Sequence, residues 1–540
     1  MPLQRTGPYA FGRLGSNTTG RLTEMGAGLR PVLDSPHVSL LGTGAVGWPE
    51  ETGASWAPTP LPPQITGPAD NMAREHDAVS VIEHESGAEL HGGVSGAVPI
   101  YVDTTGGEVL FSSSIEPLVR TRAAIEPDWD GWAQMLAAGA PLGGRTTVAG
   151  IRRLRPWERI TVHDDGAIRS DASAWPWLEY GPEPGANLAT VAEELESAVA
   201  QLAKRGRLAP LLSGGWDSRI LATLAQRATT DGPLTARTTS SDTGTVMEEL
   251  IAAKVATHLG LDHRVLMPHR DQLGADVARF AETVDYQTSF HVWFVPVQRD
   301  LDAGSGTALD GLGGGLFLGG AFPDPAGSRE PVIDRRFNRL THYLGEAESV
   351  LAPKVIRAIR DRTRTGFEQV ARPLLGHPFA STFTAYLNRT LPGISLAPYG
   401  LLAASTTVAT PFLSDRVVAA ALQLPPHLHQ DGQLYPRLLG RVDPYLAELP
   451  TAEQLAPWPR PHPRRIASAE GARQIRDLVL TEPVRELIAD DLAAADLPRW
   501  QTLLSTTRPQ HLLRGLAVMS LWYQAHEGVL GGRGVAELVS

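Results

Sequence analysis

The first third of the chain reads as short strands separated by turns. Apolar residues gather in short runs that Gly, Pro, Asp or Ser interrupt. Gly106 and Gly107 lie between two such runs and predict a hairpin. Residues 115–122 and 129–138 instead carry a helical pattern. The predicted strands cover residues 78–82, 88–91, 98–102, 109–113, 151–154 and 159–162.

The first 65 residues give a weaker signal. They are rich in Gly, Pro, Thr and Ser, and apolar pieces such as residues 38–41 suit short strands or irregular loops. Residues 48–68 hold six prolines, which predicts an extended surface segment.

Helix and strand patterns alternate after residue 187, which predicts an α/β domain. Residues 187–205 repeat apolar positions on one helical face. Gly260 follows a second helical pattern as a C-cap. Residues 179–186 form a Pro- and Gly-rich linker, so we expect domains of residues 1–183 and 184–540. The further predicted elements are strands at 208–212, 234–239 and 264–266 and helices at 220–228 and 246–259.

Composition and charge narrow the possible functions. A chain of 540 residues exceeds one core, and its formal net charge of −11 argues against a general nucleic-acid binder. No apolar run reaches membrane-spanning length, and the N-terminus lacks the apolar core of a secretory signal. We therefore expect a cytoplasmic protein with no nucleic-acid or membrane partner.

The chain contains no cysteine, which excludes disulfides, Cys metal sites and thiol catalysis. Lysine occurs only at Lys204, Lys254 and Lys354. A cationic catalytic group late in the chain must therefore be Arg or His.

Residues 211–219, Leu-Leu-Ser-Gly-Gly-Trp-Asp-Ser-Arg, follow a predicted strand and precede a predicted helix. Such a turn is an anion site, because free backbone N–H groups and the helix dipole point at one spot. Ser213 and Ser218 can donate to phosphate oxygens. Asp217 would be repelled by phosphate unless a cation lies between them, which indicates Mg²⁺.

The spacing differs from the Walker pattern, because no Lys follows the glycines. Ser-Gly-Gly-x-Asp-Ser instead resembles the pyrophosphate loop of enzymes that cleave ATP between its α and β phosphates and adenylate a substrate. The resemblance implies that Asp217 is catalytic and holds Mg²⁺. It implies ATP binding by Leu211, Ser213, Gly214, Gly215, Asp217 and Ser218.

Residues 75–165 resemble the N-terminal domain of asparagine synthetases, a class II glutamine amidotransferase fold of the αββα type. Residues 98–101, 111–118 and 151–157 carry most of the match. Glutaminases of this class use the Cys exposed after Met removal, but residue 2 here is Pro2. The resemblance therefore implies a degenerate domain that hydrolyses no glutamine and serves as a scaffold or a peptide-docking surface.

The following residues resemble the ATP-binding domain of the same family, a doubly wound, adenine-nucleotide α-hydrolase-like (PP-loop) synthetase fold. Backbone groups near Thr238 would hold adenine. The helix at residues 246–259 fits the family pattern, and we interpret Glu248 and Glu249 as a solvated helix start.

Residues 307–320 resemble the family's Ser-Gly-x-Gly-x-Asp-Glu-Leu-Phe-Gly-Gly loop, so Asp310, Gly311 and Gly313 would complete the ATP site. The family's second Mg²⁺ ligand, an Asp, falls on Gly315. We expect Asp310 to replace it as a metal ligand. The alternative is that Asp310 only caps the loop.

Two further family positions differ. The usual catalytic Glu falls on Thr407, and the Tyr of the related β-lactam synthetases falls on Leu312, so the Tyr–Glu dyad is missing. Where the family has a basic residue, the chain offers Arg460, Arg464 and Arg465. We take Arg460 and Arg464 as catalytic candidates that hold pyrophosphate. The alternative is a solvated basic loop.

The resemblance implies an ATP- and Mg²⁺-dependent ligase that releases AMP and pyrophosphate and joins a carboxylate to an amine. Without a glutaminase or the dyad, the chain is most similar to lasso-peptide macrolactam cyclases. A leader-binding protein and a protease would then be partners. The open alternatives are a β-lactam synthetase-like or asparagine synthetase-like enzyme using a small-molecule amine or ammonia, and a nucleotide-binding pseudoenzyme.

Overall fold

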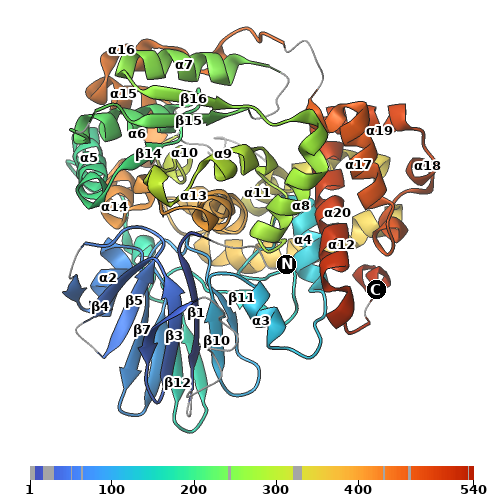
Figure 1. Cartoon of the computed structure of the whole chain (residues 1–540), viewed down its shortest axis with the longest axis horizontal. Coiled ribbons are helices and arrows are strands. Elements are labelled where there is room, and N and C mark those ends of the chain that lie inside the picture. Colours follow the sequence, from blue (N-terminus) through green and yellow to red (C-terminus); the bar gives the residue numbers. More distant parts are fainter. Residues whose placement is uncertain are drawn as a thin grey trace.

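The computed structural model describes residues 6–15, 29–49, 52–62, 65–230, 232–240, 245–319, 331–429, 432–459, 464–532 and 534–539. Figure 1 shows the strand-rich N-terminal region (blue) beneath a parallel sheet (green), with the C-terminal helices (red) to one side. Within the described ranges, the helices are too short or too polar to cross a membrane.

Two mainly antiparallel sheets form the N-terminal region. Their strand orders are β11-β9-β10-β1-β3-β2 and β13-β12-β8-β7-β5-β4-β6. Leu14, Leu40, Val81 and Leu90 come from both sheets and share one core, so the sheets pack face to face. The bounds are β1 Tyr9–Leu14, β2 Arg30–Asp34, β3 Val38–Thr43, β4 Ala45–Pro49, β5 Gly53–Ala57, β6 Thr66–Gly67, β7 Val79–His84, β8 Gly87–His91, β9 Tyr101–Asp103, β10 Val109–Ser112, β11 Ile151–Arg153, β12 Arg159–His163 and β13 Ile168–Asp171.

The predicted hairpin is confirmed, because β9 and β10 pair antiparallel and Gly106 and Gly107 both have positive φ. The predicted surface segment at residues 48–68 is wrong in its middle. There β5 is an inner strand of the second sheet, and Trp56 is 2% exposed. The prolines lie outside β5, so they do not interrupt its hydrogen-bond ladder.

Helix α4 (Trp129–Ala138) ties the N-terminal region to the C-terminal helices. It packs against α12 (Pro353–Ala371) and α20 (Thr507–His526), and the rings of Trp132 and Trp522 lie 5.6 Å apart. The predicted boundary at residue 183 falls between the 3₁₀ turn Pro176–Glu179 and α5 (Leu188–Arg205). The other N-terminal helices are α2 Ala69–Glu75 and α3 Glu116–Arg120.

A parallel sheet carries the second region. Strands β14 (Leu208–Pro210), β17 (Thr307–Leu309) and β18 (Val408–Ala409) form one part, and β15 (Thr235–Thr239) and β16 (Asp262–Leu266) the other. A parallel bridge joins the parts, and Leu212 N donates to Arg237 O at 2.8 Å. Helix α6 (Trp216–Ala228) follows β14, and α7 (Met247–Leu259) follows β15. The α/β prediction is confirmed.

The remaining helices complete the second region and its C-terminal bundle. Their bounds are α8 Leu273–Thr283, α9 Val295–Asp300, α10 Gly314–Phe317, α11 Val332–Leu340, α13 Ala380–Ala385, α14 Asp415–Gln423, α15 Leu434–Val442, α16 Pro444–Glu448, α17 Ala469–Val479, α18 Asp490–Ala493 and α19 Leu497–Ser505.

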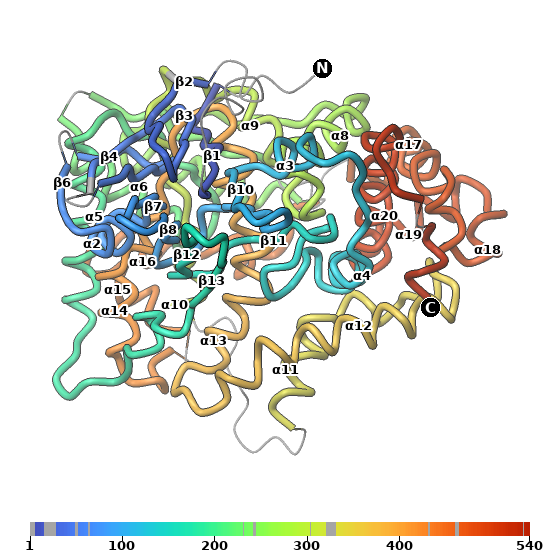
Figure 2. Tube along the Cα trace, turned by 90° about the horizontal axis from the view of Figure 1, so that it is seen from below, coloured from blue at the N-terminus to red at the C-terminus, as the bar shows by residue number. Residues whose placement is uncertain are grey.

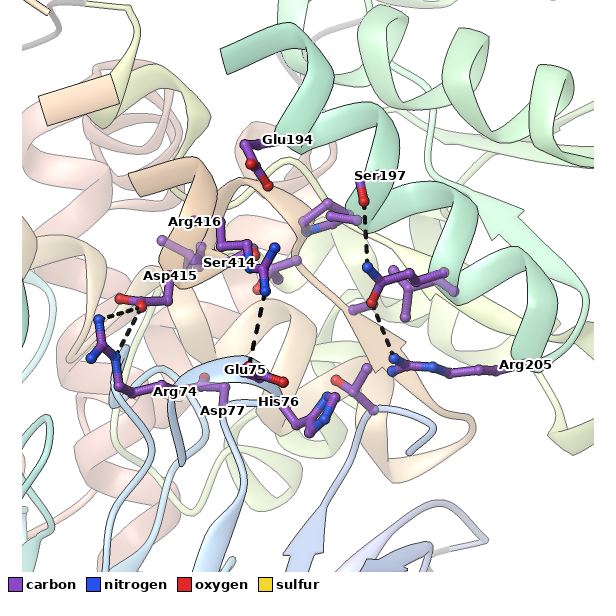
Figure 3. Close-up of a pocket in the computed structure, with 18 of the residues that line it drawn as sticks. Arg74, Glu75, His76, Asp77, Glu194, Ser197, Arg205, Ser414, Asp415 and Arg416 are labelled. Carbon is purple, nitrogen blue, oxygen red and sulfur yellow. Dashed lines mark hydrogen bonds and ion pairs between the residues drawn. The ribbon is translucent and has the colours of Figure 1, made fainter. Parts of the chain in front are cut away.

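Charged side chains join the two regions around a polar cavity of about 390 Å³ between α2, α5 and the start of α14. Figure 3 shows Arg74 paired with Asp415 and Arg416 with Glu75 across this cavity. Asp415 also accepts a hydrogen bond from Trp177 Nε1 at 2.9 Å. Arg74, Glu75, Asp415 and Arg416 thus help to hold the N-terminal region against α14.

Arg153 is a second link between the regions. This β11 residue is 5% exposed, and its Nη1 donates to Leu391 O at 2.7 Å. Its Nη2 donates to Ser395 Oγ at 3.1 Å. Because burial of an arginine is costly without partners, these bonds fix residues 391–395 against the N-terminal sheet.

Candidate active site

Residues 211–215 connect β14 to α6 at the carboxyl end of the parallel sheet, and residues 216–219 form the first turn of α6. Gly215 is extended and caps α6, so the helix begins at Trp216 and not at the predicted residue 220. The sequence pattern placed the start of the helix too far along the chain, because Asp and Ser are poor helix formers. Asp217 and Ser218 therefore belong to the first turn, whose free N–H groups favour an anion.

Two serine side chains hold this loop in a tight turn through hydrogen bonds. Ser218 Oγ accepts a hydrogen bond from Ser213 N at 3.0 Å, and the two hydroxyl oxygens also lie 3.0 Å apart. Ser213 Oγ accepts from Gly215 N at 3.2 Å. The loop is thus held by its own side chains, whereas the sequence analysis expected the two serines to donate to phosphate.

The Arg219 side chain holds the loop through hydrogen bonds to backbone carbonyl oxygens. This role was not predicted from the sequence. The Arg219 guanidinium is fully buried and donates to Gly214 O at 2.8 Å and Pro450 O at 2.7 Å. It also donates to Leu446 O at 3.0 Å and to Leu449 O. Burial lowers the pKa of Arg219 to about 10. The signal was hidden because all of its acceptors except Gly214 O lie more than 200 residues away.

The second predicted loop meets the first. Asp310 N donates to Ala409 O at 3.1 Å, and Asp310 Oδ1 accepts from Leu312 N at 2.8 Å. A Cβ on Gly311 would lie 2.6 Å from Asp217 Cβ, and one on Gly314 would lie 2.7 Å from Asp217 Oδ1. Glycine at both positions therefore lets the two loops approach each other.

Asp217 and Asp310 form a pair of buried carboxyls. Burial, and secondarily the charge of Asp310, raises the pKa of Asp217 to about 7, and burial raises the pKa of Asp310 to about 6. Among the described residues, the Tyr435 hydroxyl interacts with the Asp217 carboxyl group, and Asp217 Oδ1 is buried with no other hydrogen-bond partner. Two carboxylates that line one cavity fit Mg²⁺, which binds one or two protein carboxylates together with phosphates. A cluster of three or more metal-ligating side chains is absent from the described residues.

These groups line a cavity of about 480 Å³. Of the predicted site residues it contains Leu211, Ser213, Gly215, Asp217, Ser218, Asp310, Gly311 and Gly313. Trp293, Phe294 and Val297 add an apolar wall, and Leu312 stands where the resemblance places a Tyr. Thr407 instead contacts Thr307 Oγ1 at 3.0 Å through its own hydroxyl, within the sheet.

Thr238 lies one residue away from the cavity lining. Its hydroxyl donates to Leu212 O at 2.7 Å and lies 2.8 Å from His263 Nε2. Its neighbours Arg237 and Thr239 line the cavity instead. The side chain of Thr238 thus serves the sheet, and adenine contacts would fall to the adjacent residues.

The position of Glu248 contradicts the expectation of a solvated helix start. We expected a solvated helix start, but the Glu248 carboxylate accepts a hydrogen bond from Gly214 N at 2.6 Å and lines the cavity. Burial raises the pKa of Glu248. Glu249 is likewise buried, at 9% exposed. The sequence pattern could not show this, because the loop and α7 meet only in the folded sheet.

Arg464 and Arg465 lie outside the lining of the first cavity. Arg464 lines a second cavity of about 340 Å³, and its Nη1 donates to Gln510 Oε1 at 3.3 Å. Arg465 is buried, forms an ion pair with Asp276 and donates to His269 O at 3.1 Å, so its role is structural at least in part. Arg460 falls outside the described residues.

His291 and Arg389 line both cavities, so the two cavities are adjacent, and the sequence analysis missed both residues. His291 has φ of 67°, an uncommon conformation for a residue other than glycine. Burial, together with the charges of Arg389 and Arg514, lowers the pKa of His291 to about 3, so it is neutral at physiological pH. Its strained backbone lies at the junction of the cavities, where strain is often stored in functional sites.

Comparison with known proteins shows which family the second region resembles. No curated protein matches the chain. Residues 190–442 match the model of the asparagine synthase family, and this range holds both loops and all five strands of the parallel sheet. The strand-rich N-terminal region fits a class II amidotransferase-like domain. Residues 190–442 thus resemble an asparagine synthase domain, and this match supports an ATP-dependent C–N ligase at a coarse level.

Proposed function

We propose that the protein adenylates a substrate carboxylate and joins it to an amine of the same molecule, closing a macrolactam in a lasso-type precursor peptide. The observation that carries the proposal is the meeting of the serine loop with Asp217 and Asp310 in one cavity. A carboxylate pair facing a phosphate-type loop suits a metal–triphosphate.

The first step would activate the carboxylate. Its oxygen attacks the α phosphorus of ATP, the bond from this phosphorus to the bridging oxygen breaks, and pyrophosphate leaves. Ser213, Ser218 and the α6 N-terminus would hold the leaving phosphates, and Trp293 and Phe294 offer an apolar wall for adenine. Mg²⁺, held by Asp217 and Asp310, would supply charge neutralisation.

The second step would form the amide. The amine nitrogen attacks the acyl carbon, the bond from this carbon to the AMP oxygen breaks, and the amine releases a proton to solvent. Binding both groups of one molecule gives a high effective concentration. The second cavity supports a substrate larger than ammonia and aspartate, because it offers a further volume of about 340 Å³ next to the first. The chain has no cysteine that could release ammonia from glutamine by thiol chemistry.

The test measures the products of ATP cleavage and the peptide product. A linear peptide with a free N-terminal amine and an internal Asp or Glu is incubated with ATP and Mg²⁺. We expect AMP and pyrophosphate, and a peptide that has lost one water. Asp217→Ala should abolish pyrophosphate release, whereas Asp271→Ala, which changes an exposed carboxylate, should leave it unchanged.

Each other outcome contradicts a part of the proposal. Release of ADP and phosphate would contradict adenylation. Pyrophosphate release with aspartate and ammonia alone would favour an asparagine synthetase. ATP binding without any cleavage would favour a nucleotide-binding partner protein.

A further inference from the structure

The first and second cavities share part of their lining. Among the described residues, His291, Trp293, Arg389 and Ile394 line both cavities, and we call them the shared wall. In the proposed function, the nucleotide lies in the first cavity and the remainder of the peptide in the second. The acyl carbon and the attacking amine would therefore meet beside the shared wall.

One residue of the shared wall, His291, has a side chain that can accept a proton. The indole of Trp293 and the guanidinium of Arg389 only donate hydrogen bonds, and Ile394 is apolar. A neutral imidazole instead carries one N–H donor and one nitrogen lone pair. Within the shared wall, removal of a proton from the amine therefore falls to His291.

The carboxylates near the two cavities are placed for other tasks. Asp and Glu are absent from the described residues that line the second cavity. In the first cavity, Asp217 and Asp310 are the proposed Mg²⁺ ligands. Glu248 accepts a hydrogen bond from Gly214 N at 2.6 Å, on the loop that would hold the phosphates. These three carboxylates do not belong to the shared wall, so they leave the amine side to His291.

The His291 ring presents an accessible nitrogen. Neither ring nitrogen has a hydrogen-bond partner among the described residues, and Nδ1 is buried whereas Nε2 is not. With the ring proton on Nδ1, Nε2 carries the lone pair. Burial, and then the charges of Arg389 and Arg514, lower the pKa of His291 to about 3. The ring is thus neutral before the substrate binds, and its lone pair can accept an N–H.

Aromatic side chains fix the orientation of this ring. The ring centre of Trp293 lies 5.1 Å from that of His291, with an angle of 67° between the two planes. The Phe294 ring lies 5.8 Å away at 88°, and the Phe290 ring 6.0 Å away. Edge-to-face contacts of this kind are favourable and restrict rotation of the imidazole.

The backbone around His291 is strained. Asp285, Tyr286 and His291 have φ of 52°, 59° and 67°, a conformation that is uncommon for residues other than glycine. Three such residues within one short segment persist only where the surrounding structure fixes them. Residues 285–291 thus hold the imidazole in place at an energetic cost, as functional sites often do.

Contacts from both regions of the protein fix this segment. Thr288 Oγ1 donates to Gly139 O at 2.9 Å, and Gly139 is the C-cap of α4. Thr239 Oγ1, at the end of β15, donates to Trp293 O at 2.6 Å. Figure 2 shows α4 and α8 next to α20, whose residues contribute to the second cavity. The segment is therefore anchored on each side of His291.

From this juxtaposition we propose that His291 accepts the proton of the attacking amine in the amide-forming step. The amine nitrogen bonds to the acyl carbon, the bond from this carbon to the AMP oxygen breaks, and one N–H proton moves to Nε2. The imidazolium then passes this proton to solvent and becomes neutral again. The proposal rests on the proposed function in taking an acyl-adenylate and an amine as the reactants.

The bound nucleotide would favour this proton transfer. The positive charges of Arg389 and Arg514 disfavour a proton on His291 in the free protein. Arg389 also lines the first cavity, where the phosphate of AMP brings negative charge. A nearby negative charge stabilises the imidazolium, so His291 becomes a better proton acceptor once the acyl-adenylate has formed.

The test separates adenylation from amide formation in the full chain. Adenylation is measured as pyrophosphate–ATP exchange with the linear peptide after acetylation of its N-terminal amine, which prevents cyclisation. Amide formation is measured as cyclic product from the unmodified peptide. We expect His291→Asn to retain exchange and to cyclise about 100-fold more slowly, the scale of general base catalysis. Asn tolerates the left-handed conformation, so the backbone is kept.

A control and a rescue distinguish proton transfer from packing. His427→Asn, which changes an exposed histidine, should alter neither exchange nor cyclisation. His291→Gly also suits the backbone conformation and leaves the space of the ring empty. Imidazole added to this variant should restore part of the cyclisation. Pyrazole, a ring of the same size and much lower basicity, should restore little.

Three outcomes would overturn the proposal. Cyclisation by His291→Asn at the wild-type rate removes the proton role. Equal loss of exchange and cyclisation assigns His291 to binding instead. Equal rescue by imidazole and pyrazole shows that the ring only fills space. Each of these, with exchange intact in the wild type, contradicts this inference alone, whereas a wild type that forms no pyrophosphate contradicts the proposed function and this inference with it.

Discussion

The Glu248 carboxylate accepts a hydrogen bond from Gly214 N at 2.6 Å and so occupies an N–H donor of the phosphate-type loop. A negative charge at this point repels a triphosphate. We predict that Glu248→Gln binds metal-free ATP about tenfold more tightly, which corresponds to about 1.4 kcal/mol. Calorimetric titration checks this, with Glu196→Gln on α5 as an exposed control. Weaker binding of Mg²⁺-ATP by Glu248→Gln would instead place this carboxylate among the metal ligands.

We predict that substitution of Arg219 lowers the free energy of unfolding, because this side chain holds the loop in place. Arg219→Met leaves buried carbonyl oxygens at Gly214, Leu446 and Pro450 without donors. We expect a loss of about 2–3 kcal/mol in the free energy of unfolding, measured by denaturant titration. Arg227→Met on the same helix loses only a bond to Val442 O and should cost clearly less. Equal losses in the two variants would contradict this account of Arg219.

The carboxyl pair predicts a pH dependence. The pKa of Asp217 is raised to about 7 and that of Asp310 to about 6, above the ordinary value of 3.8. The folded state therefore binds more protons than the unfolded chain, and the contribution of these groups to stability falls as pH rises from about 4 to about 7. Saturating Mg²⁺ should offset the fall, since the ion favours the charged carboxylates.

Thermal unfolding between pH 4 and 8, with and without Mg²⁺, measures this effect. Asp217→Asn cannot ionise, so its melting temperature should fall less with pH than that of the wild type. Identical pH slopes in the two proteins would show that Asp217 does not titrate in this range.

Two adjacent glycines give a matched pair. A Cβ at Gly314 would lie 2.4 Å from Tyr435 Oη, whereas the nearest atom to a Cβ at Gly315 is Asp217 Oδ2 at 3.9 Å. We expect Gly314→Ala to reduce pyrophosphate release by about tenfold or more through displacement of Asp217, a misplacement effect of known scale. Gly315→Ala should retain activity, and a reversal of this order would contradict the packing described above.

The metal assignment has its own test. Asp310→Asn should raise the Mg²⁺ concentration required for turnover while changing stability by no more than about 1 kcal/mol. Because the space at Gly315 is open toward Asp217, Gly315→Asp should restore part of the activity of Asp310→Asn. A magnesium titration like that of the wild type would leave Asp310 as a loop cap.

Local patterns predicted much of this molecule, since α5, the 106–107 hairpin and the serine loop depend on neighbours in the chain. Val191, Leu195 and Val199 are buried as their spacing indicates. The misses are contacts between distant segments. Arg219 finds three of its four acceptors beyond residue 445, and Glu248 meets the loop only in the folded sheet. The inner strand β5 was hidden by its flanking prolines. Periodicity carries no information on such meetings.

Arg153 gives the strand-rich region a mechanical role. It fixes Leu391 and Ser395, and the next residues in the chain, among them Ala397 and Pro398, line the nucleotide cavity. A protein cut down to residues 184–540 would lose the support beneath one wall of its own active site. Experiments on the second region should therefore use the whole chain, because the strand-rich region supports one wall of the cavity that contains the serine loop.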